Sequence, residues 1–177
     1  RQKTFQTWRR ELEASYIGIS LQPFYKNYGK RLIKSSKFYY FDSAIVCYLT
    51  RQPSMQSALS GSMGGALFEG FIVSEVWKSF YNRGKRPSAY FWRSQGGLEV
   101  DLLIEAKGKL WPVEIKLTST PMIKHTNALN RFKEIAGADA ADQGVIVCRT
   151  NKKKSLPGNN VALPWNDFSE LINKIVE

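Results

Sequence analysis

The sequence predicts an α/β fold with a mixed central sheet. Three observations support this: the order of the expected elements, the turn residues between them, and a composition typical of a globular domain. After residue 61 the apolar periodicity gives the order α-β-β-β-α-β and a closing helix. Gly96-Gly97 and Lys107-Gly108 separate neighbouring strands at hairpin spacing, and Thr120-Pro121 is expected to begin the second helix. The expected helices span 66–81, 121–136 and 166–176, and the expected strands span 89–93, 98–105, 110–117 and 144–148.

A separate segment is predicted for residues 1–60. An amphipathic helix over 4–16 precedes two extended runs, 16–21 and 31–41, which a basic loop joins. A helix followed by a hairpin resembles the end of a winged-helix domain, in which the helix can enter the major groove of DNA, although winged helices also dock proteins. Asp42 is expected to cap a short helix, and the stretch 52–65, rich in Ser, Gly and Pro, marks the boundary with a second domain over 61–177.

Basic residues exceed acidic ones, and their distribution is uneven. The chain carries 26 Lys and Arg against 15 Asp and Glu, a net charge of +11, and residues 1–50 hold nine of these bases against three acids. Such an excess favours a polyanionic partner, because basic side chains release the counterions condensed on phosphates; a basic surface without a partner is the alternative. We expect DNA contacts from six residues, namely Arg9, Arg10, Lys26, Lys30, Arg31 and Arg93.

The apolar stretches are short, so neither a membrane span nor a signal peptide is predicted, and we expect a cytoplasmic protein. Cys47 and Cys148 lie in apolar runs, where a small buried side chain is expected rather than a disulfide or a metal ligand. His125 falls on the apolar stripe of its predicted helix, which favours a structural histidine over a catalytic base.

Two neighbouring predicted strands carry charged side chains that a hairpin brings together. Glu114 and Lys116 share one face of their strand, and alternation places Asp101 on the face opposite to the apolar residues of its strand, which are Val100, Leu102 and Ile104. Two carboxylates suit Mg²⁺ or Mn²⁺, and such a metal can polarise a phosphodiester and activate water. Lys116 can then orient the nucleophile and stabilise charge in the transition state. The alternative is an ordinary cross-strand salt bridge on a solvated face.

Glu69 occupies an unexpected position on the predicted helix 66–81. Val73, Val76 and Phe80 form the apolar stripe of this helix, and Glu69 lies four residues before Val73, where an apolar side chain would be expected. Glu69 is therefore expected to point toward the sheet and to join Asp101 and Glu114 as a third acid. A carboxylate stabilised by the helix dipole is the alternative.

Several short stretches together resemble the domain-of-unknown-function 4143 family, the carboxy-terminal part of many bacterial and archaeal ATPases with an AAA-type module. They are Gly65-Ala66-Leu67-Phe68-Glu69, Phe91-Trp92-Arg93, Glu99-Val100-Asp101 and Val113-Glu114-Ile115-Lys116, with further likeness over 32–42 and 163–165. The resemblance implies a restriction-endonuclease-like fold and a PD-(D/E)xK nuclease site that needs Mg²⁺ or Mn²⁺. It carries that site onto Glu69, Asp101, Glu114 and Lys116, with the Ile115 carbonyl as a further metal ligand.

These observations predict a Mg²⁺-dependent DNA phosphodiesterase domain, attached in its parent chain to an upstream ATPase module and approached by DNA through the basic amino-terminal segment. No Gly-x-x-x-x-Gly-Lys-[Ser/Thr] motif occurs in these residues, so they are not expected to hydrolyse ATP alone. One alternative is a non-catalytic module that docks nucleic acid or protein. Another is an assembly element that forms a homo-oligomer or regulates the ATPase.

Overall fold

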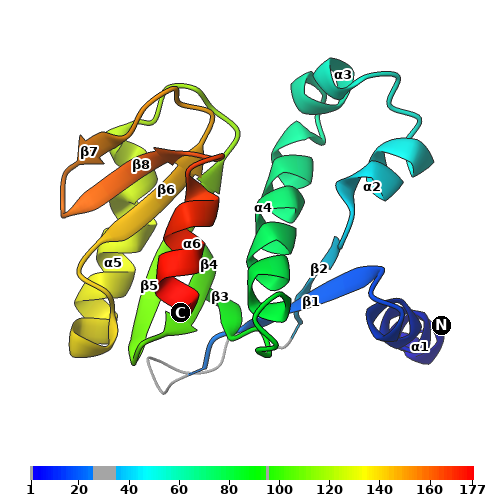
Figure 1. The fold of residues 1–177 in the computed structure, drawn as a ribbon, viewed down its shortest axis with the longest axis horizontal. Helices are drawn as coiled ribbons and strands as arrows, with labels where there is room; N and C mark the ends of the chain where they lie inside the picture. Colours follow the sequence, from blue (N-terminus) through cyan, green and yellow to red (C-terminus); the bar gives the residue numbers. More distant parts are fainter. Residues whose placement is uncertain (1, 26–34, 95) are drawn as a thin grey trace.

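The computed structural model describes residues 2–25, 35–94 and 96–177, and within them six α-helices and eight strands form (Figure 1). The α-helices are α1 (Gln2–Ala14), α2 (Ser43–Leu49), α3 (Met55–Ser60), α4 (Gly64–Tyr81), α5 (Asn127–Ala136) and α6 (Phe168–Val176). The strands are β1 (Gly18–Pro23), β2 (Lys37–Tyr40), β3 (Ala89–Arg93), β4 (Glu99–Ala106), β5 (Lys109–Lys116), β6 (Gly144–Cys148), β7 (Lys154–Leu156) and β8 (Asn160–Pro164). Two short 3₁₀ turns, η1 (Ile123–Thr126) and η2 (Gly137–Asp139), flank α5.

The strands join one mixed sheet in the order β2-β1-β3-β4-β5-β6-β8-β7. β3, β4 and β5 form an antiparallel meander, whereas β5, β6 and β8 run parallel to one another. β1 is parallel to β3 and antiparallel to β2. Along the chain, the run from α4 through β3, β4, β5 and α5 to β6 matches the predicted α-β-β-β-α-β order.

Helices cover both faces of this sheet and divide the core into two clusters. Apolar residues of α4 and α6 pack with those of β4, β5 and β6 on one face, and α5 packs on the other. The predicted stripe of α4 is confirmed, because Val73, Val76 and Phe80 are all buried. Figure 1 shows α1, α2 and α3 on the side of α4 that faces away from β6 and β8. Helices α4 and α6 on one face and α5 on the other therefore bury their apolar residues against the sheet.

The prediction for residues 121–136 was wrong at its start. Thr120 and Pro121 do not begin a helix; η1 starts at Ile123 and α5 only at Asn127. His125 explains the delay, because its Nδ1 accepts the Met122 N–H at 3.2 Å and closes a short turn before the α-helix. His125 therefore lies in the turn before α5 and not on the predicted helix.

Three further elements lie outside the predicted set. β7 and β8 follow β6, and β8 is buried along its length through parallel pairing with β6, although its apolar run is short and ends at Pro164. α3 forms inside the stretch 52–65 because the Ser54 hydroxyl caps it, accepting the Ser57 N–H at 3.1 Å. Local sequence in all three is weak in secondary-structure signal, and neighbouring elements supply the stabilisation.

The amino-terminal helix and hairpin attach directly to the common sheet. β1 pairs with β2 on one side and, through Gln22 and Pro23, with β3 on the other. The Arg9 guanidinium links α1 to the hairpin by donating to the hydroxyls of Ser20, at 2.8 Å from Nε, and of Ser36. The helix-hairpin order is therefore observed, whereas the winged-helix likeness and the domain boundary at residue 60 stay predictions. The predicted basic loop, with Lys26, Lys30 and Arg31, lies outside the described residues.

The short helix after the hairpin forms as predicted. The Asp42 carboxylate caps α2 by accepting the Ala44 N–H at 2.8 Å. Both cysteines are free; Cys148 is buried as expected, but Cys47 is partly exposed, because α2 buries none of its residues. None of the described helices is both long and apolar enough to cross a membrane.

Phe132 should be one of the main contributors to the stability of the α5 layer. It is fully buried and meets Trp92 edge to face, with ring centroids 5.4 Å apart. We expect Phe132→Ala to lower the free energy of unfolding by about 3 to 5 kcal/mol, because it leaves a cavity between α5 and the sheet. Urea denaturation measures this loss. Arg131→Ala, on the exposed side of the same helix, is the matched control, and equal losses in the two variants would contradict the assignment of Phe132 to the core.

Candidate functional site

The candidate site lies where β4 and β5 stop pairing. Their antiparallel ladder ends at the pair Leu102–Val113. Beyond it, the Asp101 side chain takes the place of a backbone partner, since its Oδ2 accepts the Ile115 N–H at 2.9 Å. The carboxylate of Asp101 therefore joins two strands that are separating, and it stays close to the backbone of β5.

The predicted alternation of side chains between the two faces of β4 is wrong at Val100, because the strand contains an irregularity. Tyr90 pairs with Leu103 and Trp92 pairs with Val100, so β4 holds one residue more than β3 between these pairs. This extra residue is a β-bulge, which changes the face that the following side chains occupy. Val100 consequently packs with Trp92 and Leu103 on the α5 side, and not with Leu102 on the α4 side, as strict alternation predicts. Bulges of this kind re-aim side chains and are common beside active sites.

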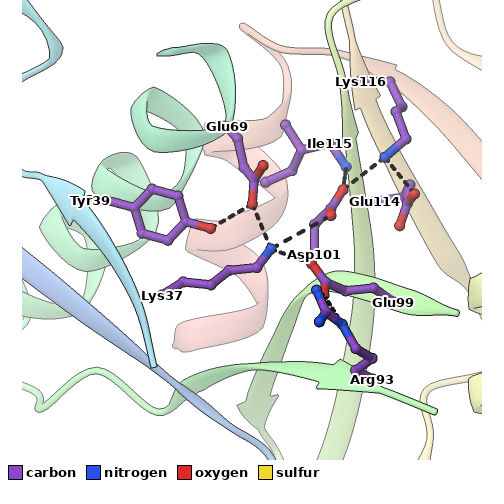
Figure 2. A network of polar contacts seen from close by, with 9 residues as sticks. All are labelled: Lys37, Tyr39, Glu69, Arg93, Glu99, Asp101, Glu114, Ile115 and Lys116. Carbon is purple, nitrogen blue, oxygen red and sulfur yellow. Dashed lines mark hydrogen bonds and ion pairs between the residues drawn. The ribbon is translucent and has the colours of Figure 1, made fainter. Parts of the chain in front are cut away.

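Asp101, Glu114 and Lys116 come together beside this bulge (Figure 2). The Lys116 Nζ lies 3.1 Å from Asp101 Oδ2 and 2.6 Å from Glu114 Oε1. The side chains of Asp101 and Glu114 are 11% and 8% exposed, whereas the Lys116 side chain is 36% exposed. One ammonium group with access to solvent thus bridges two buried carboxylates.

One oxygen of Glu114 is left without a partner. Among the described residues, Glu114 Oε2 is the one buried side-chain oxygen or nitrogen that forms no hydrogen bond. Burial, and then the charge of Asp101, raise the pKa of Glu114 to about 7, although Lys116 opposes the shift. A buried acceptor without a partner costs on the order of 1 to 3 kcal/mol. The site is therefore suited to a proton or a cation at Glu114 Oε2.

Glu69 points from α4 toward the site, but another lysine separates it from Asp101. The Glu69 Oε1 accepts from the Tyr39 hydroxyl at 2.5 Å and from the Lys37 Nζ at 2.9 Å. The same Lys37 Nζ lies 2.5 Å from Glu99 Oε1 and 4.0 Å from Asp101 Oδ1. We call these contacts of the Lys37 Nζ with Glu69, Glu99 and Asp101 the Lys37 bridge (Figure 2).

Lys37 and Tyr39 are not among the site residues that the sequence predicts. Their positions carry a signal in retrospect, because a two-residue period places Lys37 and Tyr39 on one face of β2. What the local pattern lacks is the partner: Lys37 is 32 residues from Glu69 in the chain. Only the pairing of β2 with β1, and of β1 with β3, brings the hairpin to α4 and β4.

The charges in the site stabilise one another. Burial lowers the pKa of Lys37, but Glu69, Glu99 and Asp101 outweigh this effect and raise it overall. The pKa of Lys116 is likewise raised, because Asp101 and Glu114 outweigh its burial. Both ammonium groups are therefore held in the charged form. Burial raises the pKa of Asp101, while Lys116 and the Ile115 N–H limit the shift.

The residues predicted to bind DNA occupy different environments where they are described. Arg93 is exposed and pairs with Glu99, at 2.5 Å from its Nε to Glu99 Oε2. Arg10 is exposed, and its Nε donates to the Gln6 carbonyl at 3.4 Å. Arg9 is engaged with Glu13 and Ser20 inside the chain, so it has less freedom than Arg10 to contact a phosphate. A role in DNA binding stays a prediction for each of them.

Oxygen donors for a cation are present beside Lys116. They are the carboxylates of Asp101 and Glu114 and the backbone carbonyl of Ile115, which are ligands that Mg²⁺ and Mn²⁺ prefer. Within residues 2–25, 35–94 and 96–177, no group of three or more His, Cys, Asp or Glu side chains is arranged to hold a metal ion. In this arrangement the Lys37 ammonium lies 2.9 Å from Glu69 Oε1 and 4.0 Å from Asp101 Oδ1.

Two family models match the chain. The family described as "Domain of unknown function (DUF4143)" matches residues 64–168, and "Domain of unknown function (DUF8612)" matches residues 1–56. Similar curated proteins include "Uncharacterized protein Mb2031c" of Mycobacterium bovis and "Uncharacterized protein Rv2008c" of Mycobacterium tuberculosis, each 32% identical over 123 residues. The aligned region is 68% of this chain but only 27% of each relative. These relatives are therefore much longer than the part that this chain matches.

The raised pKa of Glu114 predicts a specific dependence of stability on pH. The folded protein keeps the Glu114 proton up to about pH 7, whereas the ordinary pKa of this group is 4.5. Ionisation therefore removes stability as the pH rises from 4.5 to 7. Between pH 5 and pH 8 we expect the wild type to lose about 2 to 3 kcal/mol relative to Glu114→Gln.

Urea denaturation at several pH values in the presence of a chelator measures the difference. Glu134→Gln, which alters an exposed acid of α5 paired with Arg131 at 3.1 Å, is the control and should follow the wild type. Parallel pH profiles for the wild type and Glu114→Gln would show that Glu114 ionises as readily in the folded protein as in the unfolded chain.

Proposed function

The chain belongs to the DUF4143 family, and we propose that it is the DNA-directed, metal-dependent phosphodiesterase module of a longer ATPase, built on a restriction-endonuclease-like fold of the PD-(D/E)xK superfamily. The observation that carries this proposal is the cluster of Asp101, Glu114 and Lys116 beside a β-bulge. The order of elements from α4 to β6 matches the predicted α-β-β-β-α-β order, which supports the proposed fold.

The donor set fits a divalent cation. Glu114 Oε2 is buried without a hydrogen bond, and a hard metal ion would supply the partner that this oxygen lacks. Asp101, Glu114 and the Ile115 carbonyl would hold the ion, and Glu69 would become a further ligand once it is free of Lys37. When bound, Mg²⁺ or Mn²⁺ polarises a phosphodiester and lowers the pKa of water.

Lys116 would act as a cation in this reaction and not as a base. Its pKa is raised by Asp101 and Glu114, so the ammonium keeps its protons at neutral pH. Being partly exposed, it can donate to a water molecule or to a phosphate oxygen while it remains bonded to both acids. A positioned donor of this kind orients the nucleophile and stabilises the negative charge that develops on the phosphoryl group.

The net charge supports DNA as the substrate. A charge of +11, with the excess greatest in residues 1–50, favours a polyphosphate that approaches along the amino-terminal helix and hairpin. Arg10 and Arg93 are the described candidates for phosphate contacts; Lys26, Lys30 and Arg31, which lie between β1 and β2 in the sequence and outside the described residues, are the others. The length of the relatives fits an additional module in the parent protein, and we propose that this module is the ATPase and that the whole acts in the cytoplasm.

A non-catalytic docking module is the second candidate. It is favoured by one observation: in the arrangement described, Glu69 and Glu99 are already neutralised by Lys37 and Arg93. In this function the charge cluster holds β2, α4 and β4 together and the basic surface binds nucleic acid without turnover.

Plasmid nicking with Mg²⁺ or Mn²⁺ separates the two functions. We expect the wild type to nick DNA, and Lys116→Ala and Asp101→Asn each to reduce the rate by at least about 100-fold. Lys116→Ala removes the ammonium that stabilises negative charge in the transition state, and Asp101→Asn removes a charged ligand of the metal ion. DNA retention on a filter should change little in both. Lys78→Ala, which removes a lysine of α4 paired with Glu75 at 2.7 Å, is the control.

Two outcomes would contradict the proposal. Retained cleavage in both variants would show that the site lies elsewhere. Salt-sensitive DNA retention by the wild type, with no cleavage in either metal, would support the docking module.

A further inference from the structure

Lys37 connects the two segments that different families match. It lies on β2, within the segment of residues 1–56, and its ammonium contacts Glu69 on α4 and Glu99 on β4, within the segment of residues 64–168. The ammonium also lies over the Phe91 ring, 5.4 Å from its centre, in a cation–π contact. A lysine of the first segment thus compensates the negative charge of acids in the second (Figure 2).

Two of the acids that face Lys37, Glu99 and Asp101, each contact a second basic side chain as well. Glu99 bonds to Lys37 through Oε1 and to Arg93 through Oε2. Asp101 presents Oδ1 to Lys37 at 4.0 Å and bonds to Lys116 through Oδ2 at 3.1 Å. A cation that binds between these carboxylates therefore meets an ammonium group that holds the same oxygens.

Tyr39 strengthens this arrangement from the same strand. Its hydroxyl donates to Glu69 Oε1, the same atom that accepts from Lys37. β2 therefore presents two donors side by side to one carboxylate oxygen, and it fixes the Glu69 side chain in the direction of Lys37. Release of Glu69 for another ligand requires both contacts to break or to rearrange.

We propose that Lys37 is a built-in competitor of the metal ion: its ammonium neutralises Glu69, Glu99 and Asp101, and a divalent cation gains Glu69 and Asp101 together only when Lys37 leaves them. This inference rests on the proposed metal-dependent function. The physical reason is that an ammonium and a divalent cation at contact distance repel each other in a partly buried site, where solvent screens the charges weakly.

The position of Lys37 makes such a displacement feasible. Lysine carries a compact charge on a flexible four-carbon stem, so the ammonium can move without a change in the backbone. Its side chain is 23% exposed, so part of it already contacts solvent. β2 is also the terminal strand of the sheet order, and within that sheet it pairs with β1. The bridge can therefore open while both clusters of the core remain packed.

Direct measurement of Mn²⁺ binding to the full chain, by calorimetry and by the electron paramagnetic resonance of free Mn²⁺, tests the inference. We expect Lys37→Met to bind Mn²⁺ at least about tenfold more tightly than the wild type, since a competing charge is removed. Lys78→Met, on α4, should leave the affinity unchanged. Asp101→Asn should weaken binding in both the wild-type and the Lys37→Met backgrounds.

The outcomes separate the two proposals. Mn²⁺ binding by the wild type with equal or weaker binding by Lys37→Met would overturn the competitor role and leave the metal-dependent function standing. An absence of Mn²⁺ binding in both proteins would overturn the metal-dependent function, and the competitor role with it. Tighter binding in Lys37→Met that is lost with Asp101→Asn supports both.

A thermal melt covers the case in which the variant folds poorly. Lys37→Met leaves Glu69, Glu99 and Asp101 with less compensation, so its melting temperature should fall in a chelating buffer. Mn²⁺ should restore the melting temperature of this variant by more than it raises that of the wild type. Lys37→Gln, which keeps a hydrogen-bond donor without the charge, should behave in the same direction. Failure of Mn²⁺ to raise the melting temperature of either variant would overturn the proposal.

Discussion

The arrangement of the site depends on how two buried acids are compensated between β4 and β5. A carboxylate inside a sheet costs several kcal/mol unless cations or N–H groups receive it. Asp101 obtains this compensation from the Ile115 amide and from Lys116, and Glu114 obtains it from Lys116 at one oxygen only. The strands can separate at this point because the Asp101 side chain replaces a backbone contact. Burial of the acids therefore lowers the stability of the fold, while the Asp101 carboxylate also helps to join the two strands.

The local part of this arrangement follows from sequence periodicity, and the long-range part does not. A two-residue period in two adjacent strands is enough to place Glu114 beside Lys116 and to bring both near Asp101. The same rule failed for Val100, because a bulge inserts one residue into β4 and no local pattern marks it. Lys37 was not predicted for another reason, because its partners lie far from it in the sequence. Only the order of strands in the sheet brings β2 close to α4. β8 was missed because its stability comes from β6 rather than from its own short apolar run.

The two family matches meet within one sheet. Their limits, at residues 56 and 64, lie on either side of the predicted boundary at residue 60, yet β1 of the first segment pairs with β3 of the second. The site crosses the same border, since Lys37 and Tyr39 come from one segment and Glu69, Glu99 and Asp101 from the other. The family matches therefore separate two segments that hydrogen bonds and ion pairs join in the structure. A shift of the hairpin would therefore change the contacts that Lys37 and Tyr39 make with these acids.

The place of β2 in the sheet order has a consequence for association between molecules. A strand at the end of a sheet offers N–H and C=O groups with which a strand of another chain can pair, and natural proteins discourage this with short edge strands and with charged side chains that point inward. β2 has both features, because it is four residues long and directs Lys37 into the site. A neighbouring strand that added to this edge would disturb an ammonium that three acids hold. The resistance of the sheet to edge-to-edge aggregation and the neutrality of its acids therefore depend on the same side chain.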